Sequence, residues 1–98
     1  MKKIQELVDW IDDELEGAKC YAEKYVYKKA KGSQWAGTFH QMAEDELRHA
    51  EAIHQLAVEE IEQLNTVFKA PEEMQAKWDE SHKAYVEKAA WIRQMLAM

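Results

Sequence analysis

Apolar residues recur every three or four positions along nearly the whole chain, and the pattern is interrupted only near Gly32 and Pro71. A repeat of about 3.6 residues is typical of helices that bury one face. The chain has only three Gly and one Pro, so it has little of the material from which turns are made. The pattern therefore predicts an all-α fold of three long helices.

Two breaks divide these helices. Gly32 predicts the end of the first helix, because glycine ends helices at low cost. Ser33 is the predicted N-cap of the second helix, which should run to about Lys69. The predicted apolar face of this second helix consists of Trp35, Phe39, Met42, Ala43, Ala50, Ile53, Ala57, Ile61, Leu64 and Phe68.

Ala70 and Pro71 predict the second break, because the residue before a proline avoids the helical region. Pro71 is expected in the first turn of a third helix. We therefore expect a single domain over residues 1–98. It would contain a helical hairpin over about 4–69 and a C-terminal helix over about 71–97.

The composition limits the classes of partner. A net charge of −6 disfavours nucleic acid and anionic membrane surfaces, because both call for a basic patch. The chain has no apolar run of about 18 residues and no signal-peptide pattern, so no membrane span and a cytoplasmic location are expected. A single cysteine, Cys20, excludes an intrachain disulfide and a Cys-x-x-Cys iron site.

Chain length predicts self-association. A chain of 98 residues buries only about two thirds of its unfolded surface, and helices this long need apolar partners along their length. We therefore expect a homo-oligomer, at least a dimer.

Glu46 and His49 lie three residues apart in the second predicted helix, so both side chains can reach the same ligand. Glu51 and His54 repeat this Glu-x-x-His spacing, so spacing alone does not identify a site. Helical phase separates the two carboxylates: Glu46 lies close to the centre of the apolar face, whereas Glu51 lies more than about 90° away. A carboxylate on an apolar face is costly unless it is paired or binds a metal.

The first predicted helix supplies a partner for this pair. Glu14 lies on the side of the apolar face, and Glu16 points nearly the other way. If the hairpin turns near Gly32, residues whose numbers sum to about 63 lie at the same level, which places Glu14 opposite His49. Phase and level therefore predict that Glu14, Glu46 and His49 converge.

Three ligands make half of a known arrangement. Di-metal carboxylate bundles use one Glu from each of two helices and a Glu-x-x-His from each of two others, and two copies of this hairpin would supply that set. In such a dimer the two Glu46 side chains, one from each copy, would bridge two metals. Glu14 and His49 of each copy would complete the ligands of one metal. Oxygen ligands with one imidazole suit iron or manganese, with zinc possible.

The segments 13–21 and 43–50 resemble the ferritin-like di-iron superfamily, particularly the first half of a rubrerythrin-type domain, and the resemblance covers about residues 4–68. The half-length encapsulated ferritins complete their iron site by dimerising and are the closer architectural analogue. Their spacing favours Glu16 over Glu14 as the ligand of the first helix, so both remain candidates. An encapsulin-type shell is the partner that this analogy implies, although residues 92–98 do not resemble a docking tail.

The resemblance implies a ferroxidase-type oxidoreductase that oxidises Fe(II) with dioxygen or peroxide, for iron storage or detoxification. Tyr21 is expected at most to support the site from outside the ligand set. His40, His54 and His82 are read as isolated histidines without a metal. The alternative is a non-catalytic helical scaffold protein in which the same side chains form a buried polar network.

Overall fold

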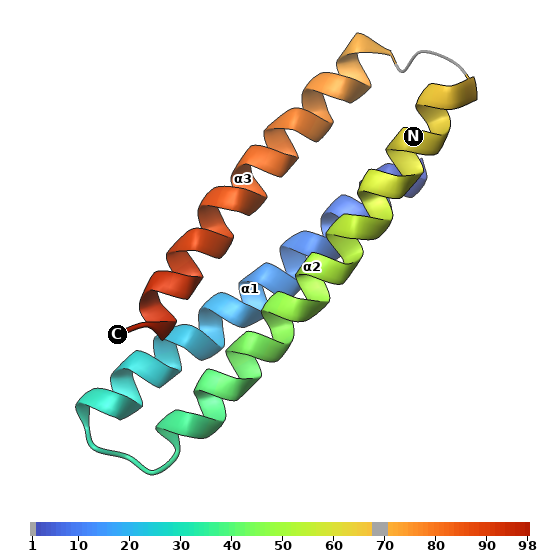
Figure 1. Ribbon diagram of the computed structural model, residues 1–98. Coiled ribbons are helices and arrows are strands. Elements are labelled where there is room, and N and C mark those ends of the chain that lie inside the picture. Colours follow the sequence, from blue (N-terminus) through green and yellow to red (C-terminus); the bar gives the residue numbers. More distant parts are fainter. Residues whose placement is uncertain (1, 68–70) are drawn as a thin grey trace.

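The computed structural model describes residues 2–67 and 71–98, and over those residues it contains three α-helices and no strand (Figure 1). Helix α1 spans Lys2–Ala30, α2 spans Ala36–Val67 and α3 spans Glu72–Leu96. Helices α1 and α2 form an antiparallel hairpin and α3 runs back alongside it, which gives a rod of 55 × 17 × 17 Å. The predicted all-α fold, a hairpin followed by a third helix, is confirmed.

Gly32 ends α1 as predicted. Its φ of +67° lies in the region that other residues seldom adopt. The N–H of Gly32 donates to the carbonyl of Lys29 at 3.0 Å, and the N–H of Ser33 donates to that of Lys28 at 2.9 Å. These paired bonds form a Schellman motif and satisfy carbonyls that the end of a helix leaves free. The turn therefore sets the register in which α2 packs against α1.

The start of α2 differs from the prediction. The helix begins at Ala36, and the Ser33 hydroxyl instead accepts the N–H of Trp35 at 3.1 Å in the turn before it. Trp35 is 59% exposed, so its predicted place on the apolar face is wrong. Leu47, absent from that predicted face, is buried because α3 covers its side of α2. The predicted end of the second helix, from Phe68 to Ala70, lies outside the described residues.

Alanines form the contact between α1 and α2. Their short side chains let the two helix backbones approach closely, and the five that are fully buried are Ala18, Ala22, Ala43, Ala50 and Ala57. The largest fully buried side chains are those of Ile11, Leu15 and Ile92, which join both helices to α3 in one apolar cluster. The core thus lies along the line where the three helices meet.

Helix α3 covers one side of the hairpin. Pro71 stands immediately before its first residue instead of within the first turn, and Glu72 and Glu73 open the helix as predicted. Its buried residues, Ala89, Ile92 and Met95, lie in its second half, and it packs mainly on α1. The opposite side of the hairpin has no helix over it among the described residues (Figure 1). No helix in the described part of the chain has the length and apolar character needed to cross a bilayer.

Candidate metal centre

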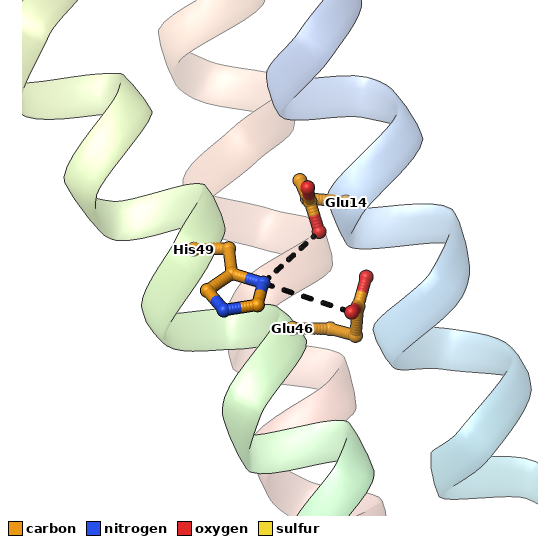
Figure 2. Close-up of side chains that lie close together, drawn as sticks. All are labelled: Glu14, Glu46 and His49. Carbon is orange, nitrogen blue, oxygen red and sulfur yellow. Dashed lines mark ion pairs between the residues drawn. The ribbon is translucent and has the colours of Figure 1, made fainter.

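Glu14 of α1 and Glu46 and His49 of α2 point toward one another (Figure 2). His49 Nδ1 lies 3.5 Å from Glu14 Oε2 and 3.7 Å from Glu46 Oε1. One potential ligand atom from each residue lies within 4.8 Å of the other two. The convergence that helical phase and hairpin level predict is therefore present, and the role of the three side chains as ligands stays a prediction.

The cluster sits where the hairpin brings the two helices to the same level. Glu14 and Glu46 are half-buried, and the His49 side chain is 56% exposed. In Figure 2, α3 passes behind the hairpin, and the three side chains lie between α1 and α2. The cluster thus faces the side of the hairpin that α3 leaves open.

Gly17 makes room for Glu46. A Cβ added at Gly17 would lie 2.8 Å from Glu46 Oε2, closer than real Cβ contacts. Gly17 stands three residues after Glu14, so it lies on the same face of α1. Any other residue here would require the Glu46 carboxylate to move from its present position. Our reading of the sequence missed this role, although a glycine inside a helix one turn from a candidate ligand is a visible signal, because glycine costs helix stability.

The two carboxyl groups perturb each other. A hydrogen bond with Glu46, supported by those from Trp10 and His49, lowers the pKa of Glu14. The same bond to Glu14, together with burial and the charge of Glu14, raises the pKa of Glu46. The charge of each carboxylate disfavours ionisation of the other, so the last proton leaves the pair less readily than the first. A bound cation would offset this repulsion.

Trp10 also touches the cluster. Its indole N–H donates to Glu14 Oε1 at 3.2 Å, which holds one carboxylate oxygen while the other faces His49. Tyr21, predicted to support the site, instead stacks on Phe39 at a ring-centroid distance of 6.4 Å. Among the described residues it makes no hydrogen bond to the three clustered side chains. The aromatic residue that supports the cluster is therefore Trp10, which lies one turn before Glu14 and donates a hydrogen bond to it.

The other candidates point elsewhere. Glu16 is exposed and pairs with Lys88 of α3, because it lies about 160° around α1 from Glu14. Glu51 pairs with Arg93 of α3 at 3.3 Å. The structure therefore brings Glu14, and not Glu16, to the cluster. It places the second Glu-x-x-His against α3.

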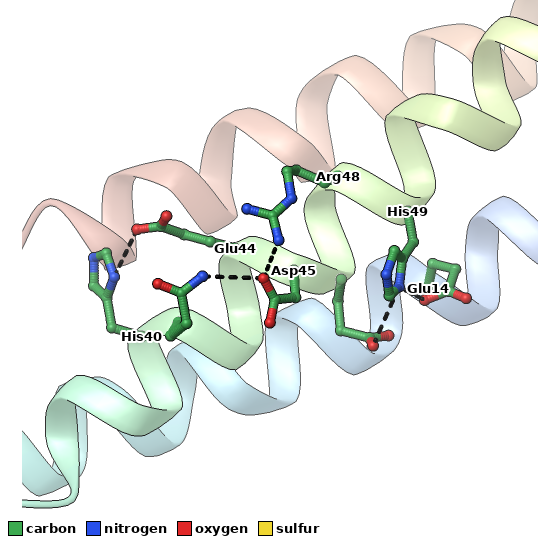
Figure 3. A network of polar contacts seen from close by, with 8 residues as sticks. Glu14, His40, Glu44, Asp45, Arg48 and His49 are labelled. Atoms are coloured by element: carbon green, nitrogen blue, oxygen red, sulfur yellow. Dashed lines mark hydrogen bonds and ion pairs between the residues drawn. The ribbon is translucent and has the colours of Figure 1, made fainter.

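The carboxylates next to Glu46 in the sequence have partners of their own (Figure 3). Glu44 Oε1 lies 2.7 Å from His40 Nδ1. Asp45 forms an ion pair with Arg48 one turn along α2. Of the acidic run 44–46, Glu46 is thus the member that faces α1, and among the described residues its ion-pair partner is His49, with no lysine or arginine paired to it.

The donor set fits iron. Two carboxylates and one imidazole are hard and borderline donors that suit Fe, Mn and Zn, and the open side leaves further coordination positions to solvent or to a second chain. Burial and the charge of Glu14 raise the pKa of Glu46, so a cation beside the two carboxylates would favour their ionised forms. These residues therefore can hold a divalent cation.

Comparison with known proteins adds independent information. Neither the curated proteins nor the solved structures that were searched contain a match to this chain. A family model does match: the model described as Rubrerythrin aligns with residues 7–95. This match includes Glu14, Glu46 and His49 and extends over most of α1, all of α2 and most of α3. The chain belongs to the rubrerythrin family.

Proposed function

We propose that this protein binds iron through Glu14, Glu46 and His49 and oxidises Fe(II) with dioxygen or peroxide, for iron storage or for detoxification. The observation that carries this proposal is the convergence of two carboxylates and one imidazole from two helices, with ligand atoms within 4.8 Å. Membership of the rubrerythrin family supports it, because proteins of this superfamily hold iron with such residues.

The electrostatics support a cation at this position. Without one, the charge of each carboxylate disfavours ionisation of the other, and the pKa of Glu46 is raised. A divalent ion would favour the ionised form of both groups. His49 is more than half exposed and its Nδ1 already faces both carboxylates, so this nitrogen is placed to join them as a ligand.

We further propose that a second copy of the chain completes the site. The open side of the hairpin carries exposed apolar side chains around the cluster: Trp10 is 52% and Leu56 is 51% exposed. Leu56 lies seven residues from His49, on the same stripe of α2. A twofold axis through this face would bring a second Glu14, Glu46 and His49 to the first set, which gives the ligand pattern of a di-metal carboxylate bundle.

When bound, iron supplies one-electron chemistry, in which each Fe(II) gives one electron to dioxygen or peroxide and becomes Fe(III). The protein's part is to set the charge and geometry around it. Glu14 and Glu46 together provide two negative charges, which favour the trivalent ion over the divalent one. Trp10 holds the Glu14 carboxylate in place, and Gly17 leaves room for Glu46 beside it.

An anaerobic Fe(II) titration of the purified protein tests the proposal, with the mass of the particle followed by light scattering. We expect saturable binding of about one iron per chain together with dimer formation, because metal binding and assembly are linked. Saturable binding to a monomer would contradict the shared site. Absence of saturable binding would favour the helical scaffold protein, in which Glu14, Glu46 and His49 form a polar network without a metal.

A further inference from the structure

His54 of α2 and His82 of α3 were read from the sequence as isolated histidines, but the structure places them in contact. His54 Nε2 lies 2.8 Å from His82 Nδ1. At this distance a proton must lie between the two nitrogens, because two lone pairs would repel. Two imidazoles from separate helices therefore direct one nitrogen each at a common point.

Aromatic side chains of α3 hold the His54 ring. Tyr85 stacks on it at a centroid distance of 4.3 Å and an interplanar angle of 9°, and Trp78 stacks at 5.4 Å and 26°. Stacking fixes the plane of the ring and thus the direction in which Nε2 points. His82 is exposed and stands between Trp78 and Tyr85 along α3, so its ring has solvent on its outer side. One imidazole is thus oriented in advance, and the other is free to adjust.

This pair is separate from the candidate iron site. His54 is five residues from His49, which places it about 140° around α2, on the side that α3 covers. The residues around the pair belong to α2 and α3, whereas the candidate iron site is built from α1 and α2. Neither histidine contacts Glu14, Glu46 or His49 among the described interactions.

We propose that His54 and His82 form a second metal site, which takes a borderline transition ion such as Zn²⁺, Ni²⁺ or Cu²⁺ and bridges α2 to α3. Imidazole nitrogen is the donor that these ions prefer, and Ca²⁺ or Mg²⁺ would be excluded. Metal–nitrogen bonds of about 2.0–2.1 Å at a tetrahedral angle separate the two nitrogens by about 3.3 Å. The pair needs to open only slightly from its present contact, and the exposed His82 ring can make that movement.

Metal binding requires the proton between the two rings to move, and this movement needs no further reactant. In the neutral pair, one ring donates its inner N–H to the other. On binding, that ring carries its proton on its outer nitrogen, with solvent as the carrier, so both inner nitrogens present lone pairs and no net proton is released. Burial and the neighbouring His82 lower the pKa of His54, which keeps its ring neutral and able to bind near neutral pH.

Glu51 is the third donor. It lies three residues before His54 on α2, the spacing at which a carboxylate and an imidazole reach one ion. Its present partner is Arg93 at 3.3 Å, in an ion pair whose side chains are 52% and 59% exposed. An exposed pair of this kind contributes little to stability, so the carboxylate can turn toward the metal. Solvent would fill the remaining position.

The consequence is a metal-dependent attachment of α3. Helix α3 packs mainly on α1, and among the described residues its polar contacts with α2 are the histidine pair, the Glu51–Arg93 pair and the contact of His40 with the carbonyl of Leu96. A bound ion would add two or three bonds across this boundary. Metal binding would therefore stabilise the docked position of α3 without using the candidate iron ligands.

Trp78 provides a local readout, because its indole adjoins both imidazoles. In a full-length variant with Trp10, Trp35 and Trp91 replaced by Phe, we expect Ni²⁺ or Cu²⁺ to quench the fluorescence of Trp78 saturably. We expect Zn²⁺ to compete and to raise the melting temperature, on the order of 10 °C at about a hundredfold excess over Kd.

Two isosteric variants separate metal binding from the histidine contact. His54→Gln and His82→Asn each keep a hydrogen-bonding group near the original nitrogen but remove a good metal ligand, and either should abolish the quenching and the Zn²⁺ effect. His40→Gln, which removes a histidine of α2 that instead contacts the carbonyl of Leu96, should preserve both. Quenching that persists in both isosteric variants, or no saturable quenching in the parent, would overturn the proposal. The same titration on a background with Glu46→Ala and His49→Ala should be unchanged, so this proposal and the proposed iron function can fail independently.

Discussion

Helix α2 carries the Glu-x-x-His spacing twice, at Glu46/His49 and at Glu51/His54, and the two copies have different surroundings. The first faces α1, where Glu46 meets the carboxylate of Glu14. The second faces α3, where Glu51 meets the guanidinium of Arg93. The second pair lies five residues after the first, which places it about 140° around the helix axis. The neighbouring helix, and not the motif, decides what each pair can do.

The difference is one of charge and donor type. The first pair, together with Glu14, gathers two carboxylates and one imidazole with no lysine or arginine paired to them among the described residues, a donor set that suits iron. The second pair has its carboxylate neutralised by Arg93, and its histidine meets a second histidine 2.8 Å away. It offers nitrogen donors instead, which suit Zn²⁺, Ni²⁺ or Cu²⁺.

The largest effect should come from removing the glutamate of the first pair. Glu46→Ala should reduce Fe(II) oxidation to the rate of iron in buffer, because it removes the carboxylate that adjoins both other ligands. The measurement is the initial rate of Fe(III) absorbance after air is admitted. Glu51→Ala is the matched control and should oxidise iron at the wild-type rate. Equal rates in Glu46→Ala and wild type would show that the first pair is not an iron site.

A smaller effect should follow from filling the space beside Glu46. Gly17→Ala puts a Cβ 2.8 Å from Glu46 Oε2 and displaces that carboxylate, which should weaken Fe(II) affinity about tenfold or more. The substitution also replaces a helical glycine, so the metal-free protein should become more stable by about 0.5–1 kcal/mol.

Gly37→Ala separates these two consequences. Gly37 lies in the first turn of α2 with no atom within 4 Å of an added Cβ. The Gly37→Ala substitution should therefore stabilise α2 without changing the affinity for Fe(II). Calorimetric titration and chemical denaturation measure the two quantities, and an unchanged affinity in Gly17→Ala would refute the proposed contact.

The smallest effect is on the pH dependence of stability in the metal-free protein. The pKa of Glu46 is raised above its ordinary value of 4.5, so above pH 4.5 the native state holds more proton than the unfolded chain. The free energy of unfolding contributed by this group is therefore present at low pH and is lost as pH rises through the folded pKa. Glu14, whose pKa is lowered, contributes in the opposite sense at lower pH.

Denaturation of Glu46→Gln and wild type between about pH 4 and pH 7 tests this sign. In wild type, Glu46 makes the free energy of unfolding fall as pH rises, and the glutamine variant lacks this contribution. The stability of the variant relative to wild type should therefore rise with pH. Glu51→Gln is the matched control, because its carboxylate lies beside Arg93 and not beside another carboxyl group. A constant difference between Glu46→Gln and wild type would mean that the pKa of Glu46 is not raised.

Much of the first site was predictable from the sequence. The apolar period sets the face of each helix, and Gly32 sets the turn, so the level of Glu14 opposite His49 follows from counting residues. The choice of Glu14 over Glu16 at this position needed only helical phase. Such inferences succeed because each residue of an α-helix adds about 100° of rotation, whatever surrounds the helix.

Features that depend on contacts between helices were not predictable in this way. Trp35 keeps the apolar period but lies before α2, because the Ser33 turn delays the start of the helix. Trp10, and not Tyr21, bonds to Glu14, since the side chain that reaches a given point depends on how the helices cross. His54 and His82 are distant in sequence and meet only through the docking of α3.

The sequence by itself therefore determined three amphipathic helices, the position of their turns and the level at which Glu14, Glu46 and His49 meet, because these follow from the period of the helix and the length of the hairpin. The tertiary structure decided which side of α2 faces α3. That choice depends on the packing of Ile92 and Met95 into the core, a property of three helices together. As a result, Glu46 and His49 face the side of the hairpin that α3 leaves open. Glu51 and His54 face α3, where His54 meets His82.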